Sequence, residues 1–576
     1  MLWYAIGRKG GLALLTDAPT HAPTDAPTDA PAGVAARDVL VDFERDPGSY
    51  RHWKVTVDPP VATVVMSVDA AGGFGDYELK LNSYDLSVDI ELADIVQRLR
   101  FEHPEVRAVV LTGGLDKVFC AGANIQMLAG ATHHHKVNFC KFTNETRNGI
   151  EDATTHSGQA WLAAINGTAA GGGYELALTC DEIVLIDDRS SAVSLPEVPL
   201  LGVLPGTGGL TRLVDKRHVR RDLADVFSTR IEGMRGTQAV EWGLVDSIAP
   251  KSAFAGRVRE RALARAEASD RPADASGITL GPIGHRHVGI DIDRDLRVAT
   301  FTLTVPGGDV PASPDEVVAL GDQWWPLALC RELDDAILRL RFNEPEIGTW
   351  VLQTRGSHTD VLAADALIGA HPDHWLLREI RLYWKRTLKR LDVSARTLVA
   401  LVDPGSCFAG TLAELALLAD RTYMLDHDDA EAGPATMQLG PANDGWYPMG
   451  NDLTRLQSRF YGHGDRLEEA RRHAGTALRA VDAARLGLVT ATPDDIDWDD
   501  EIRLVLEERS SFSPDAVTGM EANFRFVGPE TTETKIFGRL TAWQNWIFQR
   551  PNASGPDGAL RRYGTGSRPA YDRKRV

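Results

Sequence analysis

Cysteine is scarce in this sequence, and long hydrophobic runs are absent. The five cysteines are odd in number, lie far apart and form no C-x-x-C pair: Cys120, Cys140, Cys180, Cys330 and Cys407. This pattern argues against a disulfide framework and a zinc site, and it is typical of a reducing cytoplasm. No run reaches the roughly 18 consecutive apolar residues of a membrane span. We therefore expect a cytoplasmic protein that does not cross a membrane.

Positive charge is also in short supply. Lys and Arg together number 62 against 81 Asp and Glu, which gives a formal net charge of −19. General nucleic-acid binding needs a basic face, so this class of function is not expected. An anionic ligand would have to be held by local cations or by backbone N–H groups.

The first 38 residues contain a repeat that is rich in proline and low in large hydrophobic residues. Their Ala-Pro-Thr-Asp repeat, “TDAPTHAPTDAPTDAPAG”, predicts a disordered tail. No small-residue cleavage site of the secretory kind is evident before it. The remaining chain is too long for one compact core, so two or more domains are expected.

The chain contains an internal repeat. Residues 91–111, “ELADIVQRLRFEHPEVRAVVL”, match residues 332–352, “ELDDAILRLRFNEPEIGTWVL”. Upstream, “RHWKVTVDPPVATVVMSV” is echoed by “RHVGIDIDRDLRVATFTLTV”, each with the alternation of a β-hairpin. Downstream, “GGGYELALTCDEIVLI” is echoed by “GTLAELALLADRTYML”. These collinear matches predict a tandem duplication in which strands alternate with helices, an α/β architecture.

The repeat divides the chain into five predicted parts. In the last of them, “TKIFGRLTAWQNWIFQ” has the 3.6-residue spacing of an amphipathic helix that ends before Pro551. The predicted parts are a disordered tail (1–38), a first copy (39–270), a linker (271–283), a second copy (284–505) and a C-terminal helical extension with a basic end (506–576).

Two glycine-containing turns in the first copy are candidates for a functional site. The segments “FCAGANI” (119–125) and “AAGGGYE” (169–175) each follow a predicted strand. Glycine permits tight turns there, and such turns leave backbone N–H groups free to point into a cleft. Two converging N–H groups would form an oxyanion hole for a carbonyl oxygen.

Two glutamates stand out because their surroundings are apolar. Glu175 follows the glycines of the second turn, and Glu197 lies between Pro196 and Pro199. Facing one substrate, two carboxylates could act as general base and general acid. The alternative is structural, because a glutamate near a helix start is often a favourable dipole charge and a Gly-Gly-Gly turn is often packing.

The order and spacing of “FCAGANI”, “NGTAAGGGYELALTCDEI” and “LPEVPLLGVLPGTGGLTRL” resemble the crotonase (enoyl-CoA hydratase/isomerase) superfamily. The resemblance implies a spiral of ββα units that binds an acyl-CoA thioester. It assigns the oxyanion-hole amides to Ala123 and Gly172. It also matches Glu175 and Glu197 to the glutamates that activate and position water.

The resemblance also places three residues along the CoA arm: Ala121, Asn124 and Ile125. The family more often has aspartate where this chain has Asn124. No metal or redox cofactor is implied, since CoA arrives as part of the substrate. We also expect a homodimer.

Three further segments resemble a narrower family of ring-opening enzymes in aerobic benzoyl-CoA degradation. They are “LKLNSYDLSVDIELADIVQRLRFEHPE”, “KVNFCKFTNETRNGIED” and “WQNWIFQRPNASGPDGALRRYGTG”. This resemblance implies a carbon–carbon lyase. Its substrates would be 2,3-epoxy-2,3-dihydrobenzoyl-CoA and two waters, and its products 3,4-didehydroadipyl-CoA semialdehyde and formate. The alternatives are a general enoyl-CoA hydratase or isomerase and a non-catalytic CoA-binding scaffold.

Other polar residues near these motifs are ambiguous. Cys120 is a candidate catalytic residue, although a small buried residue behind the loop is the alternative. One of Glu145 and Arg147 could line the pocket, but a solvated helix face is the favoured interpretation. The triplet 133–135, “HHH”, is interpreted as a polar loop, because three adjacent residues converge poorly on one metal ion.

The second copy lacks parts of this site. It keeps Glu414 at the place of Glu175 but has Thr411 for Gly172, Ala363 for Gly122 and Gly440 near the place of Glu197. A degenerate copy with a structural role is therefore expected.

Overall fold

The computed structural model describes residues 40–427 and 433–576, so the predicted disordered tail lies outside the described residues. We call residues 40–270 the first half, residues 284–511 the second half and residues 512–576 the C-terminal segment. The first half is built on a six-stranded sheet of order β1-β2-β3-β5-β7-β9. Its strands are β1 (Trp53–Asp58), β2 (Val61–Met66), β3 (Ala108–Gly113), β5 (Ala160–Ile165), β7 (Glu182–Asp187) and β9 (Ser247–Pro250).

The hairpin and the parallel strands of this sheet follow from their residue patterns. The predicted hairpin is confirmed, since β1 pairs antiparallel with β2 and Trp53 lies opposite Met66. The other neighbours pair in parallel. Strands β3, β5 and β7 are almost wholly buried, as parallel strands covered on both faces must be.

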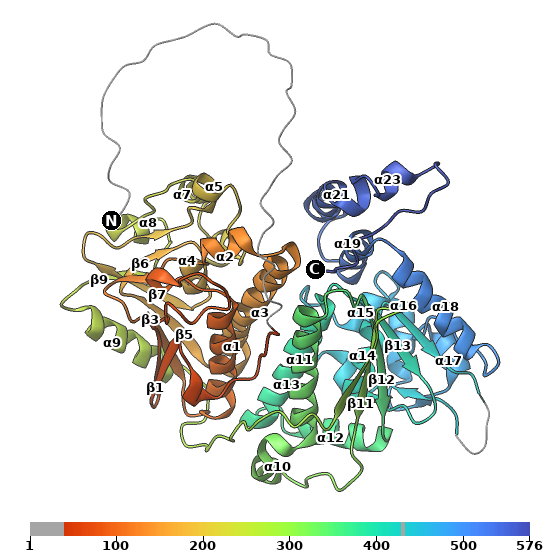
Figure 1. Ribbon diagram of the computed structural model, residues 1–576. Coiled ribbons are helices and arrows are strands. Elements are labelled where there is room, and N and C mark those ends of the chain that lie inside the picture. Colours follow the sequence, from red (N-terminus) through yellow and green to blue (C-terminus); the bar gives the residue numbers. More distant parts are fainter. Residues whose placement is uncertain (1–39, 428–432) are drawn as a thin grey trace, which may run out of the picture. The chain divides into compact units, whose positions relative to one another are not determined.

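Helices cover both faces of the sheet (Figure 1). Apolar side chains of α1 and α3 form the main core with one face, and Val258 and Ala262 of α9 pack on the other. Asp85 caps α1 by accepting the Ser87 N–H, and Gly158 ends α3 in the left-handed conformation. The helices of the first half are α1 (Leu86–Phe101), α2 (Ile125–Gly130), α3 (His133–Ser157), α4 (Gly172–Ala177), α5 (Glu197–Leu201), α6 (Gly209–Thr211), α7 (Arg221–Ser228), α8 (Gly236–Glu241) and α9 (Phe254–Glu267).

A smaller parallel sheet carries the two glycine-containing turns of the first half. It has the order β4-β6-β8. The turn at 121–123 follows β4, and the turn at 171–173 follows β6. Its strands are β4 (Lys117–Cys120), β6 (Gly167–Ala170) and β8 (Val193–Ser194).

The second half has a five-stranded sheet of order β10-β11-β12-β13-β15, again an antiparallel hairpin followed by parallel strands. A small sheet of order β14-β16-β17 accompanies it. The strands are β10 (Val288–Asp293), β11 (Val298–Thr304), β12 (Thr349–Arg355), β13 (Thr397–Val402), β14 (Phe408–Ala409), β15 (Arg421–Met424), β16 (Met437–Gln438) and β17 (Ala477–Leu478).

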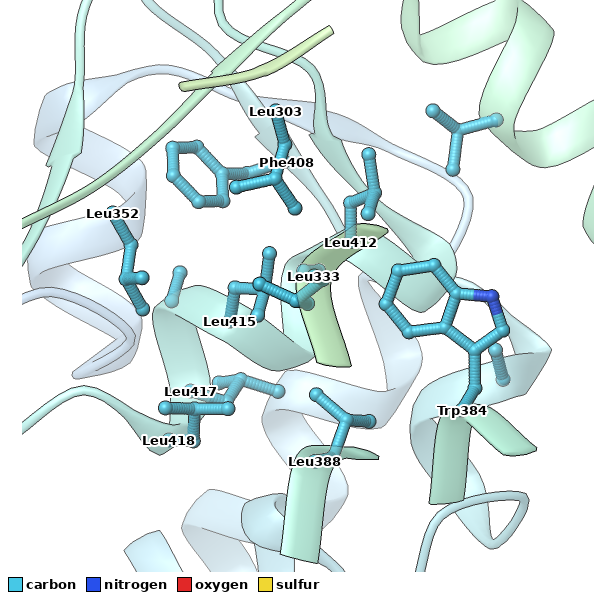
Figure 2. Packing of buried hydrophobic residues seen from close by; sticks show 14 of the residues in the cluster. Leu303, Leu333, Leu352, Trp384, Leu388, Phe408, Leu412, Leu415, Leu417 and Leu418 are labelled. Carbon is cyan, nitrogen blue, oxygen red and sulfur yellow. The ribbon is translucent and has the colours of Figure 1, made fainter. Parts of the chain in front are cut away.

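The core of the second half is rich in leucine. Figure 2 shows Leu412 and Leu415 of α14 packed among Leu333, Leu352 and Trp384. The helices are α10 (Pro314–Leu320), α11 (Trp325–Asn343), α12 (His358–Ala370), α13 (Trp375–Asp392), α14 (Gly410–Leu418), α15 (Arg455–Arg459), α16 (Gly464–Arg472), α17 (Ala480–Leu486) and α18 (Trp498–Ser511).

Buried ion pairs and aromatic rings join the two halves. Arg341 of α11 binds Glu145 of α3 through two hydrogen bonds of 2.6 and 2.8 Å. Arg100 of α1 binds Glu379 of α13 at 2.7 Å. The ring of Phe342 packs on Phe142 with centroids 6.4 Å apart. Helix α3, which borders the candidate site, is therefore held from the second half.

The C-terminal segment continues as helices, and the predicted boundary at residue 505 falls inside α18. The predicted helix around Trp543 is confirmed and ends before Pro551, with a π-helical stretch at Ile536–Leu540. Across residues 40–427 and 433–576, no helix is both long and apolar enough to span a bilayer. The helices are α19 (Pro514–Arg525), α20 (Thr532–Lys535), α21 (Thr541–Phe548), α22 (Pro551–Ser554) and α23 (Ala559–Arg562).

Candidate active site

The turn after β4 presents a free backbone amide. Gly122 has φ +92°, in the left-handed region that favours glycine. Its carbonyl accepts the Tyr84 N–H at 3.0 Å, and the Tyr84 carbonyl accepts the Asn124 N–H at 2.8 Å. Between these two bonds, the Ala123 N–H has no acceptor among the described residues.

The turn after β6 presents a second free amide next to the first. Gly171 has φ +54° and donates its N–H to the Ser194 carbonyl at 2.9 Å. Gly172 begins α4, and its N–H has no acceptor in the described part of the chain. A Cβ added to Gly122 would lie only 3.0 Å from the Gly172 nitrogen. The two turns are thus in contact, and both amides are available, as an oxyanion hole requires.

The carboxylate of Glu175 is held by the segment 207–209. Its Oε1 accepts the N–H groups of Thr207 and Gly209 at 2.9 and 2.8 Å. Its Oε2 accepts the Thr207 hydroxyl. The side chain is buried. Three donors converge on its two oxygens, so the carboxyl group is held as a hydrogen-bond acceptor.

The carboxyl group of Glu197 has different surroundings. It begins α5 and is buried, and its Oε2 has no hydrogen-bond partner among the described residues. Burial, with the nearby charge of Glu175, raises its pKa to about 7. A Cβ on Gly171 would lie 2.7 Å from Glu197 Oε1, so this carboxyl group lies directly against the second turn.

The two predicted glutamates therefore lie at one site together with the predicted oxyanion amides. Figure 1 shows α4 and α5, which carry Gly172, Glu175 and Glu197, at the same end of the first half as α2, which follows the turn with Ala123. One carboxylate is fixed by three donors, and the other holds a proton near neutral pH. Such a difference is what separate general-base and general-acid roles need.

The three residues predicted along the CoA arm differ in exposure. Ala121 and Ile125 are exposed, with 58% of Ile125 accessible. Asn124 is buried and caps α2, because its Oδ1 accepts the Met127 N–H at 2.9 Å. Its Nδ2 donates to the Glu78 carbonyl at 2.9 Å. Asn124 therefore anchors the loop, an amide role that aspartate could fill only in part.

Cys120 lies behind the first turn. It is fully buried, and burial raises its pKa to about 12. Its thiol donates to the Asn82 carbonyl at 3.0 Å, and its sulfur accepts the Gly122 N–H at 3.3 Å. These contacts favour the packing alternative over a thiolate that reacts.

Sequence reasoning named Arg147 as a possible pocket residue but favoured a solvated helix face, and it did not name Tyr84. The prediction of a solvated helix face is wrong for Arg147, which is 2% exposed. Its guanidinium donates to Tyr84 Oη and to the Gly172 carbonyl, both at 2.9 Å. Thr207 and Gly209 were also missed, although the quoted “PGTGG” signalled a tight turn close in sequence to Glu197.

The histidine triplet is not a loop. Residues 133–135 form the first turn of α3, because the chain already turns helically after Thr132. His133 stacks on Trp546 of α21, with ring centroids 5.7 Å apart. His135 meets the edge of Phe342. The three rings point to different partners, so the triplet contributes packing between segments.

The corresponding region of the second half is closed by its own side chains. Thr411, which replaces Gly172, donates its N–H to Asp365 Oδ2 at 2.8 Å. Glu414 accepts from Asn443 Nδ2 at 2.7 Å and from Arg455 at 3.1 Å. The amide that would serve a substrate oxygen is thus already occupied by an aspartate.

Comparison with known proteins supports these assignments of fold and family. The sequence model of the enoyl-CoA hydratase/isomerase family matches residues 78–275, so the chain has a crotonase-like α/β fold. Benzoyl-CoA-dihydrodiol lyase of Aromatoleum evansii is 54% identical over 547 residues, which cover 93% of this chain and 98% of that protein.

More distant relatives match only part of the chain. The fatty acid oxidation complex subunit alpha of Shewanella loihica is 38% identical over 168 residues, 29% of this chain and 23% of that protein. The solved enoyl-CoA hydratase of Bacillus anthracis is 28% identical with a TM-score of 0.32, over 37% of this chain and 76% of that one.

Proposed function

The chain belongs to the benzoyl-CoA-dihydrodiol lyase family, and we propose on this basis that it opens the ring of an oxidised benzoyl-CoA. The substrates are 2,3-epoxy-2,3-dihydrobenzoyl-CoA and two waters, and the products are 3,4-didehydroadipyl-CoA semialdehyde and formate. The observation that carries the proposal is the 54% identity over both halves and the C-terminal segment. A general hydratase such as the solved relative matches only 37% of the chain.

In the proposed mechanism, the thioester oxygen accepts hydrogen bonds from the Ala123 and Gly172 amides. As the ring reacts, negative charge moves from the ring to the thioester oxygen, which these two amides already face. Each such donor typically contributes about 2.7–4 kcal/mol to the stability of the transition state. The two free, adjacent amides support this role.

We assign the two proton-transfer roles from the surroundings of the carboxyl groups. Glu175, held as an acceptor by Thr207 and Gly209, removes a proton from the attacking water. Glu197, whose pKa is raised to about 7 chiefly by burial, delivers a proton to the oxygen of the opening epoxide. The second water then adds to the carbon that leaves as formate, and the ring C–C bond breaks.

We further propose that the second half arose by duplication and lost its site. The matching sheet orders and the collinear sequence repeats support this origin. The plug formed by Asp365 and Thr411 supports the loss of activity. We also propose the domain limits predicted from the sequence, including the C-terminal helical extension.

Three general properties complete the proposal. The reaction takes neither a metal nor a redox cofactor, so treatment with a chelator is expected to leave formate release unchanged. The enzyme acts as a homodimer in the cytoplasm, where its five free cysteines stay reduced. Light scattering coupled to gel filtration tests the dimer.

The substrate is tested by incubating the protein with 2,3-epoxybenzoyl-CoA and, in parallel, with crotonyl-CoA. The expected result is formate from the epoxide. Hydration of crotonyl-CoA without any formate from the epoxide would return the protein to the general hydratases. Turnover of neither compound would favour a CoA-binding scaffold.

A further inference from the structure

Arg147 touches both parts of the catalytic machinery. It projects from α3, which the second half holds in place. Its Nη2 donates to the carbonyl of Gly172, the residue that supplies one oxyanion amide, at 2.9 Å. Its Nη1 donates to the carbonyl of Thr207, the residue that binds Glu175, at 3.3 Å. One guanidinium therefore links the oxyanion turn to the segment that fixes the base.

The positive charge of Arg147 has no direct counter-ion. No carboxylate among the described residues lies within ion-pair distance of it, and its Nε has no hydrogen-bond partner. Several other buried arginines are paired: Arg100 binds Glu379 and Asp152, and Arg455 binds Glu414 and Asp392. Arg396 is buried without an ion pair among the described residues, but its side chain donates to backbone carbonyls away from the site. Burial of a cation without a carboxylate partner costs free energy. The presence of Arg147 beside both oxyanion turns therefore points to a functional role.

The neighbouring tyrosine links Arg147 to the first turn as well. Tyr84 Oη accepts from Arg147 at 2.9 Å, and a Cβ added to Gly172 would lie 2.0 Å from this hydroxyl. The Tyr84 backbone makes the bonds to Gly122 and Asn124 that frame the Ala123 amide. Arg147 and Tyr84 thus form one buried unit that contacts both oxyanion turns.

We propose that Arg147 is a positioning residue that fixes the Gly172 amide and the Glu175 carboxylate relative to each other, and that its unpaired charge stabilises the anionic state of the bound thioester. The inference rests on the proposed function and deepens it. A negative charge that develops on the substrate oxygen would add to the charges of Asp89 and Glu175, which lie near the guanidinium but form no ion pair with it. In a water-poor site such a charge interaction is much stronger than in bulk water.

The charged groups around Arg147 come from several elements. They are Asp89 from α1, Glu175 from α4 and Glu197 from α5, with the neutral groups Tyr84 and Cys120 beside them. Burial raises the pKa of Asp89 to about 6. For Glu197, burial and Glu175 raise the pKa, whereas Arg147 lowers it. Removing the guanidinium is therefore expected to shift the titration of Glu197 to higher pH.

The test compares Arg147→Met and Arg147→Lys with the matched control Arg455→Met. The control removes an equally buried guanidinium from the inactive second half. Three quantities are measured on each protein: the rate of formate release, the Kd for unreactive benzoyl-CoA, and the pH at which kcat/KM falls. Melting temperatures identify the folded variants.

We expect Arg147→Met to lower kcat by about 100-fold, as for loss of an oxyanion donor, while the Kd for benzoyl-CoA stays close to the wild-type value. The alkaline limb moves to higher pH. Arg147→Lys keeps the charge but not the two-armed bridge, so it regains part of the rate and leaves the limb in place. Arg455→Met lowers the melting temperature but not kcat of the folded fraction.

Wild-type kcat in Arg147→Met, or an equal loss of kcat in Arg455→Met, would overturn the inference. If Arg147→Met does not fold, Arg147→Lys decides, and a wild-type rate in that variant would contradict the role of the bridge. Absence of formate from the wild type would instead reject the proposed function. The same rate ratios would then be measured on crotonyl-CoA hydration.

Discussion

Two glutamates of the same site differ in what surrounds their oxygens. Glu175 accepts hydrogen bonds from Thr207 and Gly209, so its negative charge is stabilised by fixed donors. Glu197 has an oxygen without any partner in the described part of the chain, and burial raises its pKa to about 7. Identical side chains are thereby suited to opposite proton-transfer roles.

The pH dependence of turnover tests the role of Glu197. As a proton donor it must be protonated, so kcat/KM is expected to be level below about pH 7 and to fall above it. Initial rates of formate release between pH 5 and pH 9 measure this limb. A rate that instead rises through the same range would make Glu197 a base.

The stability of Glu197→Gln provides a second, activity-independent test. The folded-state pKa of Glu197 lies above the ordinary value of 4.5, so the folded state binds the extra proton between about pH 4.5 and pH 7. Its contribution to stability is therefore present at low pH and is lost as pH rises through this window. Relative to wild type, Glu197→Gln should gain melting temperature between pH 5 and pH 8. An unchanged difference would show that the carboxyl group titrates normally.

Substitution of Cys120 separates its two possible roles. The thiol is buried, has a pKa raised to about 12, and bonds to the Asn82 carbonyl. We expect Cys120→Ala to cost stability, about 1–3 kcal/mol for a small buried contact and its hydrogen bonds, and to keep most of the turnover. Chemical denaturation and formate assays measure the two effects. A loss of turnover as large as that in Glu175→Gln would make the thiol a participant.

At the residue scale, the sequence predicted the site residues that lie in recognisable motifs. It did not predict those that join the site only through tertiary contacts. Glu175 and Glu197 stood out in apolar surroundings, and the family resemblance assigned the amides of Ala123 and Gly172. The structure places all four residues together. Arg147 has no local signal, since a single arginine on a polar helix face reads as solvated. Only the packing of α3 against Gly172 makes it part of the site.

At the element scale, the second half has a sheet like that of the first half, but side chains fill the region that corresponds to the site. Its helix α14 starts where α4 starts in the first half, yet Asp365 of α12 occupies the Thr411 amide. Burial raises the pKa of Asp365 to about 7, so this plug is a protonatable group inside the core. Where the first half has Gly172 with a free amide, the second half has Thr411, whose amide donates a hydrogen bond to Asp365.

The variant Glu414→Gln tests whether the second half contributes chemistry. Glu414 is buried and binds Asn443 and Arg455. Neutralising it is expected to cost about 1–3 kcal/mol of stability, because a charge-assisted buried pair is weakened. Turnover of the folded fraction stays at the wild-type level. A specific loss of turnover, with stability intact, would reveal a second working site.

The elements themselves were largely predictable, and the exceptions have local causes. The hairpins around Trp53 and Val288 follow from alternating residues, and the helix near Trp543 follows from its apolar spacing. The triplet 133–135 was interpreted as a polar loop because three adjacent residues converge poorly on one metal ion, an argument that does not address secondary structure. Ring contacts with Trp546 and Phe342 stabilise this helix, and no pattern in the sequence predicts them.

At the scale of the whole molecule, the halves are coupled through α3. Glu145 of this helix binds Arg341 and Arg390 of the second half, while Arg147 two residues later binds Gly172. The second half can therefore be necessary for activity, because it holds the helix that borders the site. This coupling could not be read from the sequence, since it depends on residues about 200 positions apart.

The formate released in a single turnover, with enzyme in excess over 2,3-epoxybenzoyl-CoA, tests the proposed ring opening most directly. We predict one formate for each epoxide consumed by the wild type. The rate in Glu175→Gln and in Glu197→Gln should fall by about 10²- to 10⁴-fold, the usual contribution of a general acid or base. Consumption of the epoxide without formate, or near-normal release in both variants, would contradict the central claim.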